Sequence, residues 1–201
     1  MPFVLQQEIA PGATLGLWKT EETVGELLPL CTPQERRQAE AFTHEHRRRE
    51  WLAWHALLQT LLPGARAGYD AQGGPRLENG PHIGVSHTPG YAAVILAGTP
   101  CAVDIESTGR NYARVLNRYA SPQEQALGES LPDPGLYPAL FWCAKETLYK
   151  LKRQAGVDFL HDMHIESADP DARSLQTRFR GTPQPLQYLL LGSLCCVFGL
   201  E

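Results

Sequence analysis

The sequence lacks a long hydrophobic run, and this argues against a segment that spans a membrane. Its longest apolar stretch, residues 188–200, is too short and too interrupted to cross a bilayer. No basic segment followed by an apolar core occurs before residue 30, so we expect no export signal. Low-complexity segments and long linkers are missing as well. At 201 residues, 43% hydrophobic and 20% charged, the chain is expected to be soluble and to form one large or two small domains.

Paired cysteines and an excess of positive charge are also missing. The five cysteines form no C-x-x-C motif and have no histidine at ligand spacing, which argues against a structural zinc site. The odd count suits a reduced chain, so we expect a cytoplasmic protein. The net charge of -4 argues against general nucleic-acid binding, and no nucleic-acid partner is expected. An anionic ligand would have to meet a local basic patch.

Two acidic residues stand near the middle of the chain. Alternation along residues 101–106 predicts a strand whose end presents Asp104 and Glu106 on the same face. Two neighbouring carboxylates repel each other unless a cation lies between them. A hydrated Mg²⁺ is the usual solution, because it takes hard oxygen ligands and leaves other positions for water and phosphate.

A helix some forty residues later carries a third acid. At helical period, an apolar stripe of Leu140, Ala144, Leu148 and Leu151 leaves Glu146 and Lys150 together on another face, one turn apart. By itself this pair is more typical of an ordinary solvent-side ion pair than of a site. Beside Asp104 and Glu106, however, Glu146 could complete a set of three carboxylates.

The remaining pattern predicts alternating sheets and helices. We expect strands at 14–20, 82–87, 91–97, 101–106, 157–165 and 187–198, and helices from Pro33 into the forties and over 46–62. Similar capping boxes, Thr32 to Glu35 and Ser121 to Glu124, can arise by chance in any helical protein and also fit a chain of two similar halves. The strands from 82 to 106 should form an antiparallel meander, which would place Ser86 and His87 ~10 Å from the acids of the third strand.

These motifs together resemble one known family. The segment from Gly73 to Glu106, with Ser86-His87 and Val-Asp-Ile-Glu, is followed by Trp-Cys-Ala-Lys-Glu-x-x-x-Lys, and the combination resembles the 4'-phosphopantetheinyl transferases. The likeness is greatest to the single-chain, surfactin-synthetase-activating type in its short bacterial form. It implies an α+β fold of two pseudo-symmetric subdomains, each a small antiparallel sheet packed on a long helix. The expected subdomains are residues 1–100 and 101–201, with the active site at their interface.

The resemblance also implies an activity. Such an enzyme transfers 4'-phosphopantetheine from coenzyme A to a serine of an apo acyl or peptidyl carrier protein and releases adenosine 3',5'-bisphosphate. Mg²⁺, or alternatively Mn²⁺, would be held by Asp104, Glu106 and Glu146. Glu146 would accept the serine proton, and Lys150 would steady the leaving phosphate. The carrier could serve fatty acid synthesis or secondary metabolite biosynthesis.

Further residues are implied as ligands of the coenzyme's phosphates. Ser86 and His87 would contact the diphosphate, Arg49 would grip the 3'-phosphate, and Arg36 lies where the family has other basic residues. The chain departs from the family at Glu35, Gln38 and Gly74, where basic residues would be expected.

Interactions with other molecules follow from the same reasoning. A predicted helix would align Arg110, Arg114 and Arg118 in a basic stripe, which fits an ordinary solvated face as well as a docking surface for the acidic carrier protein. We expect a monomer with no membrane partner. Two other functions stay open: a module that binds coenzyme A or a carrier without chemistry, and a Mg²⁺-dependent hydrolase of nucleotide diphosphates.

Overall fold

The chain divides into two compact units, Met1–Pro100 and Cys101–Glu201. A computed structural model describes residues 3–112 and 114–201. Each unit combines antiparallel sheet with helices, so the α+β class is confirmed. Within the described residues, no helix has the length and hydrophobicity needed to span a bilayer.

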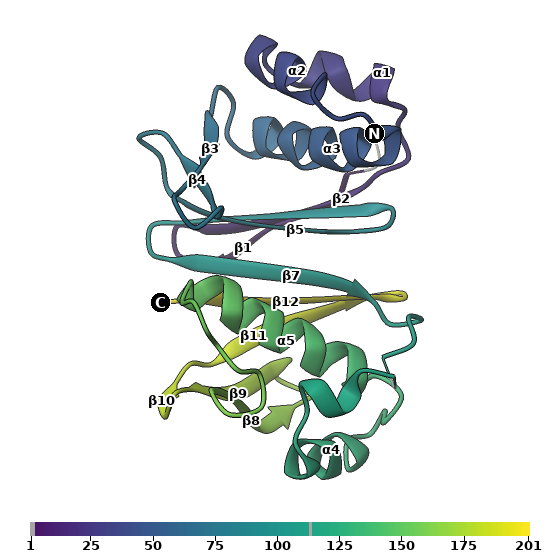
Figure 1. Cartoon of the computed structure of the whole chain (residues 1–201), viewed down its shortest axis with the longest axis vertical. Coiled ribbons are helices and arrows are strands. Elements are labelled where there is room, and N and C mark those ends of the chain that lie inside the picture. The colour runs from purple at the N-terminus through teal and green to yellow at the C-terminus, as the bar shows by residue number, and fades with distance from the viewer. Residues whose placement is uncertain (1–2, 113) are drawn as a thin grey trace. The chain divides into compact units, whose positions relative to one another are not determined.

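The first unit is a four-stranded sheet with a long helix on one face. Its elements are β1 (Phe3–Ala10), β2 (Ala13–Lys19), α1 (Val24–Leu27), η1 (Leu28–Leu30), α2 (Pro33–Ala39), α3 (Glu45–Leu61), β3 (Ala67–Tyr69), β4 (Pro75–Leu77), β5 (His82–Thr88) and β6 (Tyr91–Ala97). The main sheet has the order β1-β2-β6-β5, and every neighbouring pair is antiparallel. Helix α3 packs on β2, β5 and β6 through buried residues such as Leu52, Leu57 and Leu58 (Figure 1). This buried side of α3 anchors the helix that carries Arg49, one of the predicted phosphate ligands.

The second unit repeats the same plan with a larger sheet. Its elements are β7 (Cys101–Ser107), η2 (Leu116–Arg118), α4 (Pro122–Glu129), α5 (Tyr137–Lys152), β8 (Met163–Asp169), β9 (Ser174–Phe179), β10 (Thr182–Pro183), β11 (Leu186–Leu191) and β12 (Leu194–Leu200). The strand order is β10-β9-β11-β12-β7, and β8 also pairs with β9. Helix α5 packs directly on β7 and β12. The predicted acidic strand and the predicted acidic helix are therefore neighbours.

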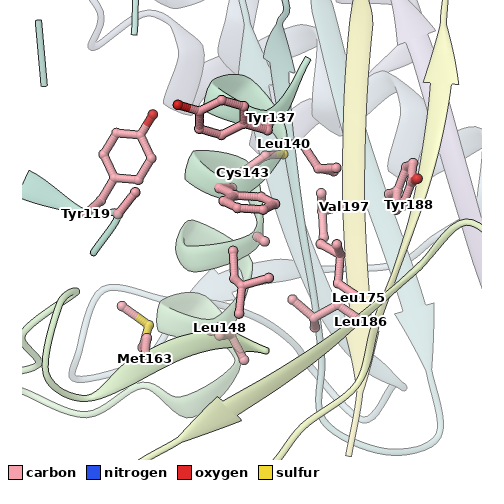
Figure 2. Close-up of a cluster of buried hydrophobic side chains, with 14 of the residues drawn as sticks. Tyr119, Tyr137, Leu140, Cys143, Leu148, Met163, Leu175, Leu186, Tyr188 and Val197 are labelled. Atoms are coloured by element: carbon pink, nitrogen blue, oxygen red, sulfur yellow. The ribbon is translucent and has the colours of Figure 1, made fainter. Parts of the chain in front are cut away.

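The apolar stripe predicted for α5 forms the core of this unit. Leu140, Ala144 and Leu148 are fully buried, and Figure 2 shows Leu140 and Leu148 directed at the sheet residues Val197 and Leu186. Burying this stripe fixes the rotation of the helix about its axis. The same packing therefore determines the direction of the opposite helix face, which carries Glu146 and Lys150.

The predicted meander of β5, β6 and β7 is wrong. Strand β6 pairs with β5 along one edge and with β2 along the other, so it has no edge left for β7. Strand β7 instead pairs with β12 along its whole length, from Cys101 opposite Leu200 to Ser107 opposite Leu194. The ~10 Å separation that the meander implied between Ser86-His87 and the acids of β7 therefore has no basis.

Several predicted boundaries also differ from the structure. Helix α2 ends at Ala39, and the strand predicted from residue 157 begins only at Met163. The strand predicted over 187–198 is a hairpin of β11 and β12, joined at Gly192 with a φ of 59°. The predicted helix for the basic stripe is wrong, because Arg110 lies in a bend and Arg118 ends a short 3-10 helix. Ala113, inside that segment, lies outside the described residues.

Both capping boxes are present, and each does more than begin a helix. Thr32 and Ser121 accept hydrogen bonds from the backbone N–H groups of Glu35 and Glu124, and these glutamates cap in return. Glu35 and Glu124 are both buried, at 4% and 3% exposure. Glu35 accepts from Gln59 on α3 and Glu124 from Lys145 on α5, so each box ties a short helix to the long helix of its unit.

Candidate active site

The two acids of β7 lie beneath α5. Asp104 and Glu106 oppose Val197 and Cys195 on β12 and share a strand face. The Nζ atom of Lys150 lies 2.6 Å from Oδ1 of Asp104, and the indole N–H of Trp142 donates to Oε1 of Glu106 over 3.0 Å. Asp104 is only 5% exposed, so its charge is held largely away from water.

Glu146 completes the acidic group from the helix side. It lies on α5 one turn after Trp142 and one turn before Lys150, which places the three side chains on one helix face. Burial raises the pKa of Glu146, Asp104 raises it further, Lys150 opposes the rise, and Glu106 adds to it. Asp104, Glu106 and Lys150 therefore all act on the Glu146 carboxylate. Their roles in metal binding and catalysis stay a prediction.

Glu106 is oriented by donors whose contact with it was not predicted from the sequence. Besides Trp142, the guanidinium of Arg110 approaches Oε1 at 3.4 Å from an exposed position. Burial raises the pKa of Tyr112, and the Glu106 carboxylate raises it further, which places that phenol nearby. Trp142 could have been found from spacing alone, since it precedes Glu146 by four residues within the same motif.

The predicted phosphate ligands of the first unit differ in their exposure to solvent and in the groups that they contact. Ser86 is buried in β5, whereas the His87 imidazole is exposed, with Nδ1 3.8 Å from Oε2 of Glu50. Arg49, next to Glu50 on α3, is exposed. Arg36 donates to the carbonyls of Cys31 and Pro29 over 3.0 and 3.2 Å, so its guanidinium is committed to the loop before α2.

Three positions, Glu35, Gln38 and Gly74, lack the basic residue that the family resemblance implies. The structure explains the residue present at two of them. Glu35 is a buried helix cap, so its carboxylate belongs to the fold of the first unit. The N–H of Gly74 donates to Oδ1 of Asp70 over 2.8 Å and closes the turn before β4. Gln38 is exposed on α2, and nothing in the structure explains its identity.

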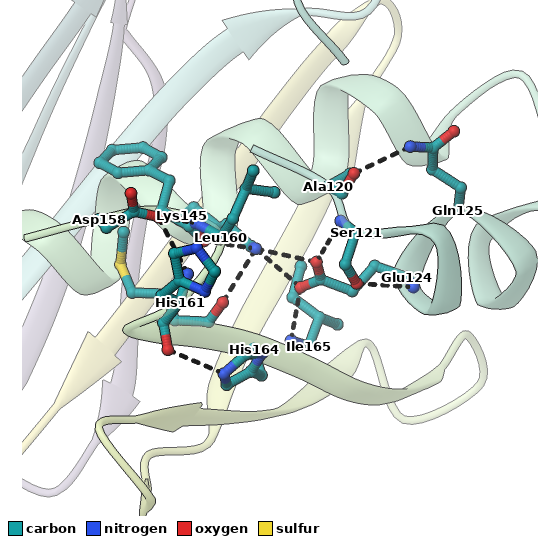
Figure 3. A network of polar contacts seen from close by, with 12 residues as sticks. Ala120, Ser121, Glu124, Gln125, Lys145, Asp158, Leu160, His161, His164 and Ile165 are labelled. Carbon is teal, nitrogen blue, oxygen red and sulfur yellow. Dashed lines mark hydrogen bonds and ion pairs between the residues drawn. The ribbon is translucent and has the colours of Figure 1, made fainter. Parts of the chain in front are cut away.

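A second polar network holds α5 from its other side. Lys145 is fully buried, and its ammonium lies 2.8 and 3.0 Å from the two carboxylate oxygens of Glu124 (Figure 3). It also donates to the carbonyls of Phe159 and Met163. Glu124 in turn accepts from the backbone N–H of Ile165, so one ion pair joins α4, α5 and β8. Sequence reasoning missed Lys145, although it adjoins Glu146.

A pocket of the second unit lies at this network. Its volume is about 810 Å³, and its walls come from residues 117–127 and 160–166. Glu124, which lines it, is already paired with Lys145 and accepts from two backbone N–H groups, those of Ser121 and Ile165. Because the polar groups at the base of the pocket satisfy one another, the candidate chemistry rests on the carboxylates of β7 and α5 instead.

The donor set of these carboxylates fits a hard divalent cation. Asp104, Glu106 and Glu146 would together offer the carboxylate oxygens that Mg²⁺ and Mn²⁺ prefer as ligands. In the described part of the chain, no group of three or more acid, histidine or cysteine side chains already has a metal-binding arrangement. Lys150 and Trp142 instead occupy oxygens of Asp104 and Glu106.

Comparison with known proteins supplies an independent observation. Residues 100–197, which span β7, α5 and most of β12, match the family model described as the 4'-phosphopantetheinyl transferase superfamily. No curated protein matches the sequence. The matched region contains all three acids of the candidate site and Lys150.

Proposed function

Because the chain belongs, through its second unit, to the 4'-phosphopantetheinyl transferase superfamily, we propose that it transfers phosphopantetheine from coenzyme A to a serine of an apo carrier protein. The family uses coenzyme A as co-substrate, acts on carrier proteins and typically needs a divalent metal. The observation that carries the proposal is the grouping of Asp104, Glu106 and Glu146 within the matched region, with Lys150 among them.

The proposed reaction is an in-line displacement at phosphorus. The serine oxygen of the carrier attacks the β-phosphorus of coenzyme A, a new P–O bond forms, and the bond to adenosine 3',5'-bisphosphate breaks. Glu146 takes the serine proton, directly or through water, because burial and the two neighbouring acids raise its pKa and make it a better base. Lys150, on the same helix face, steadies the negative charge that develops on the leaving phosphate.

Asp104, Glu106 and Glu146 would hold the divalent cation, Mg²⁺ or Mn²⁺. When bound, such an ion neutralises the charge of the diphosphate. Trp142 and Arg110 keep Glu106 oriented, and the Lys150 ammonium contacts the Asp104 carboxylate.

The first unit supplies the proposed phosphate ligands. We assign Ser86 and His87 to the diphosphate and Arg49 to the 3'-phosphate, on the strength of the family membership. Arg36 keeps this expected role with less support, since its guanidinium already donates to two backbone carbonyls.

One assay separates the candidate functions. The full chain is incubated with coenzyme A, Mg²⁺ and an apo carrier protein, and the intact mass of the carrier is recorded with the state of the coenzyme. A carrier that gains one phosphopantetheine group supports the transferase. Intact coenzyme and unmodified carrier would indicate a binding module. Cleaved coenzyme without an adduct would indicate a hydrolase.

Variants of the candidate site residues test whether these residues carry out the transfer. Asp104→Ala and Glu146→Gln should each abolish transfer while far-ultraviolet circular dichroism stays unchanged. Glu166→Gln is the control, since Glu166 is an exposed acid of β8 paired with Arg178. Transfer by Glu146→Gln at the wild-type rate would remove Glu146 from the mechanism.

A further inference from the structure

The Asp104 carboxylate already has a cation beside it. The Lys150 ammonium lies 2.6 Å from Oδ1 of Asp104 and 3.3 Å from the carbonyl of Val103, at the base of the acidic group. Asp104 is nearly buried, and a buried carboxylate without a counter-charge is strongly disfavoured. Lys150 therefore supplies a counter-charge to Asp104.

A divalent cation and this ammonium compete for the same carboxylate. A metal ion bound to Asp104 would stand within a few ångströms of the Lys150 nitrogen, and like charges at that separation repel strongly inside a protein. The lysine side chain is 32% exposed, whereas that of Asp104 is 7% exposed. The flexible and partly solvated partner is the one that can move, while the strand residue stays in place.

We propose that Lys150 is a built-in counterion of Asp104 that a divalent cation displaces, so that loading of the metal releases the ammonium toward the substrate phosphate. This inference rests on the proposed function and adds an order of events to it. The same lysine first stabilises the unloaded acids and then, once displaced, meets the charge of the leaving group. The Asp104 contact would thus hold Lys150 away from phosphate until the metal is bound.

The proposal predicts that removing the ammonium strengthens metal binding. Lys150→Met keeps the length of the side chain and removes its charge, and the affinity for Mg²⁺ measured by calorimetry, without coenzyme or carrier, should rise tenfold or more. Lys150→Arg keeps the charge and should bind Mg²⁺ about as the wild type does. Lys152→Met is the matched control, because Lys152 lies on the same helix but pairs with Glu201 and Gln184.

The wild-type protein offers a second measurement that does not depend on the stability of a variant. The chain has four lysines, Lys19, Lys145, Lys150 and Lys152, so their ammonium signals can be resolved by nuclear magnetic resonance. Titration with Mg²⁺ should shift the Lys150 signal far more than that of Lys152. Assignment follows from the signal that disappears in Lys150→Arg.

The outcomes separate this inference from the proposed function. Tighter binding by Lys150→Met, with a Lys150 signal that responds to Mg²⁺, supports the counterion. Mg²⁺ binding that is unchanged or weaker in Lys150→Met, with a Lys150 signal that does not respond, overturns the counterion and leaves the metal site standing. Absence of Mg²⁺ binding in every variant overturns both the counterion and the metal-dependent mechanism.

Discussion

The buried pair of Lys145 and Glu124 gives the sharpest stability prediction. Lys145→Met replaces a fully buried ammonium by an apolar chain of similar length. It leaves Glu124, at 3% exposure, without its counter-charge, and it removes the donor from the carbonyls of Phe159 and Met163. Glu124 still accepts from the N–H groups of Ser121 and Ile165, but these donors carry no net charge.

The expected cost is large compared with the stability of a domain. Breaking a buried ion pair by removing one partner typically costs about 3–5 kcal/mol, whereas a whole domain is stable by about 5–15 kcal/mol. Burial lowers the pKa of Lys145 and Glu124 raises it, so the pair already balances desolvation against attraction. We therefore expect Lys145→Met to remove about a fifth or more of the stability of the second unit.

Urea unfolding followed by far-ultraviolet circular dichroism measures this loss. The double variant Lys145→Met, Glu124→Gln should recover part of it, because the amide oxygen of glutamine can still accept from the backbone without a buried charge. Arg178→Met, which breaks the exposed contact with Glu166, is the control and should change stability far less. A loss below about 1 kcal/mol for Lys145→Met would refute the reasoning, since a buried charge would then cost no more than a surface one.

Two further predictions concern the other polar groups of the structure. Trp142→Phe keeps the ring but removes the N–H that donates to Glu106, so the affinity for Mg²⁺ measured by calorimetry should fall by about 10–100-fold with the fold intact; unchanged affinity would mean that this donor does not orient the acid. Burial lowers the pKa of His55 to about 3, against about 6.5 in an unfolded chain, so folded His55 stays neutral while the unfolded residue takes up a proton. The first unit should therefore lose stability, by about 4–5 kcal/mol in total at 1.36 kcal/mol for each pKa unit, as the pH falls from 6.5 toward 3. Chemical denaturation across this range should show a shallower slope for His55→Gln, and an identical slope would contradict the assignment.

Local signals predicted the elements of the site well. The apolar stripe of α5 and the alternation of β7 both follow from short-range periodicity, and these two patterns determine which faces carry Glu146 and Asp104. Their meeting then depends only on packing of α5 against β7, which the structure shows. The capping boxes were also predictable, because Thr32 and Ser121 act on residues three positions away.

Long-range pairing could not be predicted in the same way. Strand β7 follows β6 after a short turn, which favours a hairpin, yet β2 already covers the free edge of β6 from eighty residues upstream. Competition between partners far apart in the sequence leaves no local trace. The turn at Gly192 was missed because apolar residues flank it on both sides, so hydrophobicity alone predicts one continuous strand.

The burial of charged residues was also difficult to predict from the sequence. Glu35 was interpreted as an acid in place of a basic phosphate ligand, although the capping box around it already indicated a structural role. The sequence does not single out Lys145, because a lysine is rarely buried and only the fold brings Glu124 and two carbonyls to its ammonium. Neighbouring lysines of one helix thus face opposite environments, with Lys145 in the core and Lys150 at the candidate site.

The most direct test of the account is the position of a bound metal ion. Crystals of the full chain grown with Mn²⁺ and coenzyme A should show an anomalous scattering peak among the carboxylates of Asp104, Glu106 and Glu146, with the Lys150 ammonium moved from Asp104 to a phosphate oxygen. A peak at other residues, with Lys150 still on Asp104 and the coenzyme bound elsewhere, would contradict the central claim that these three acids form the catalytic metal site.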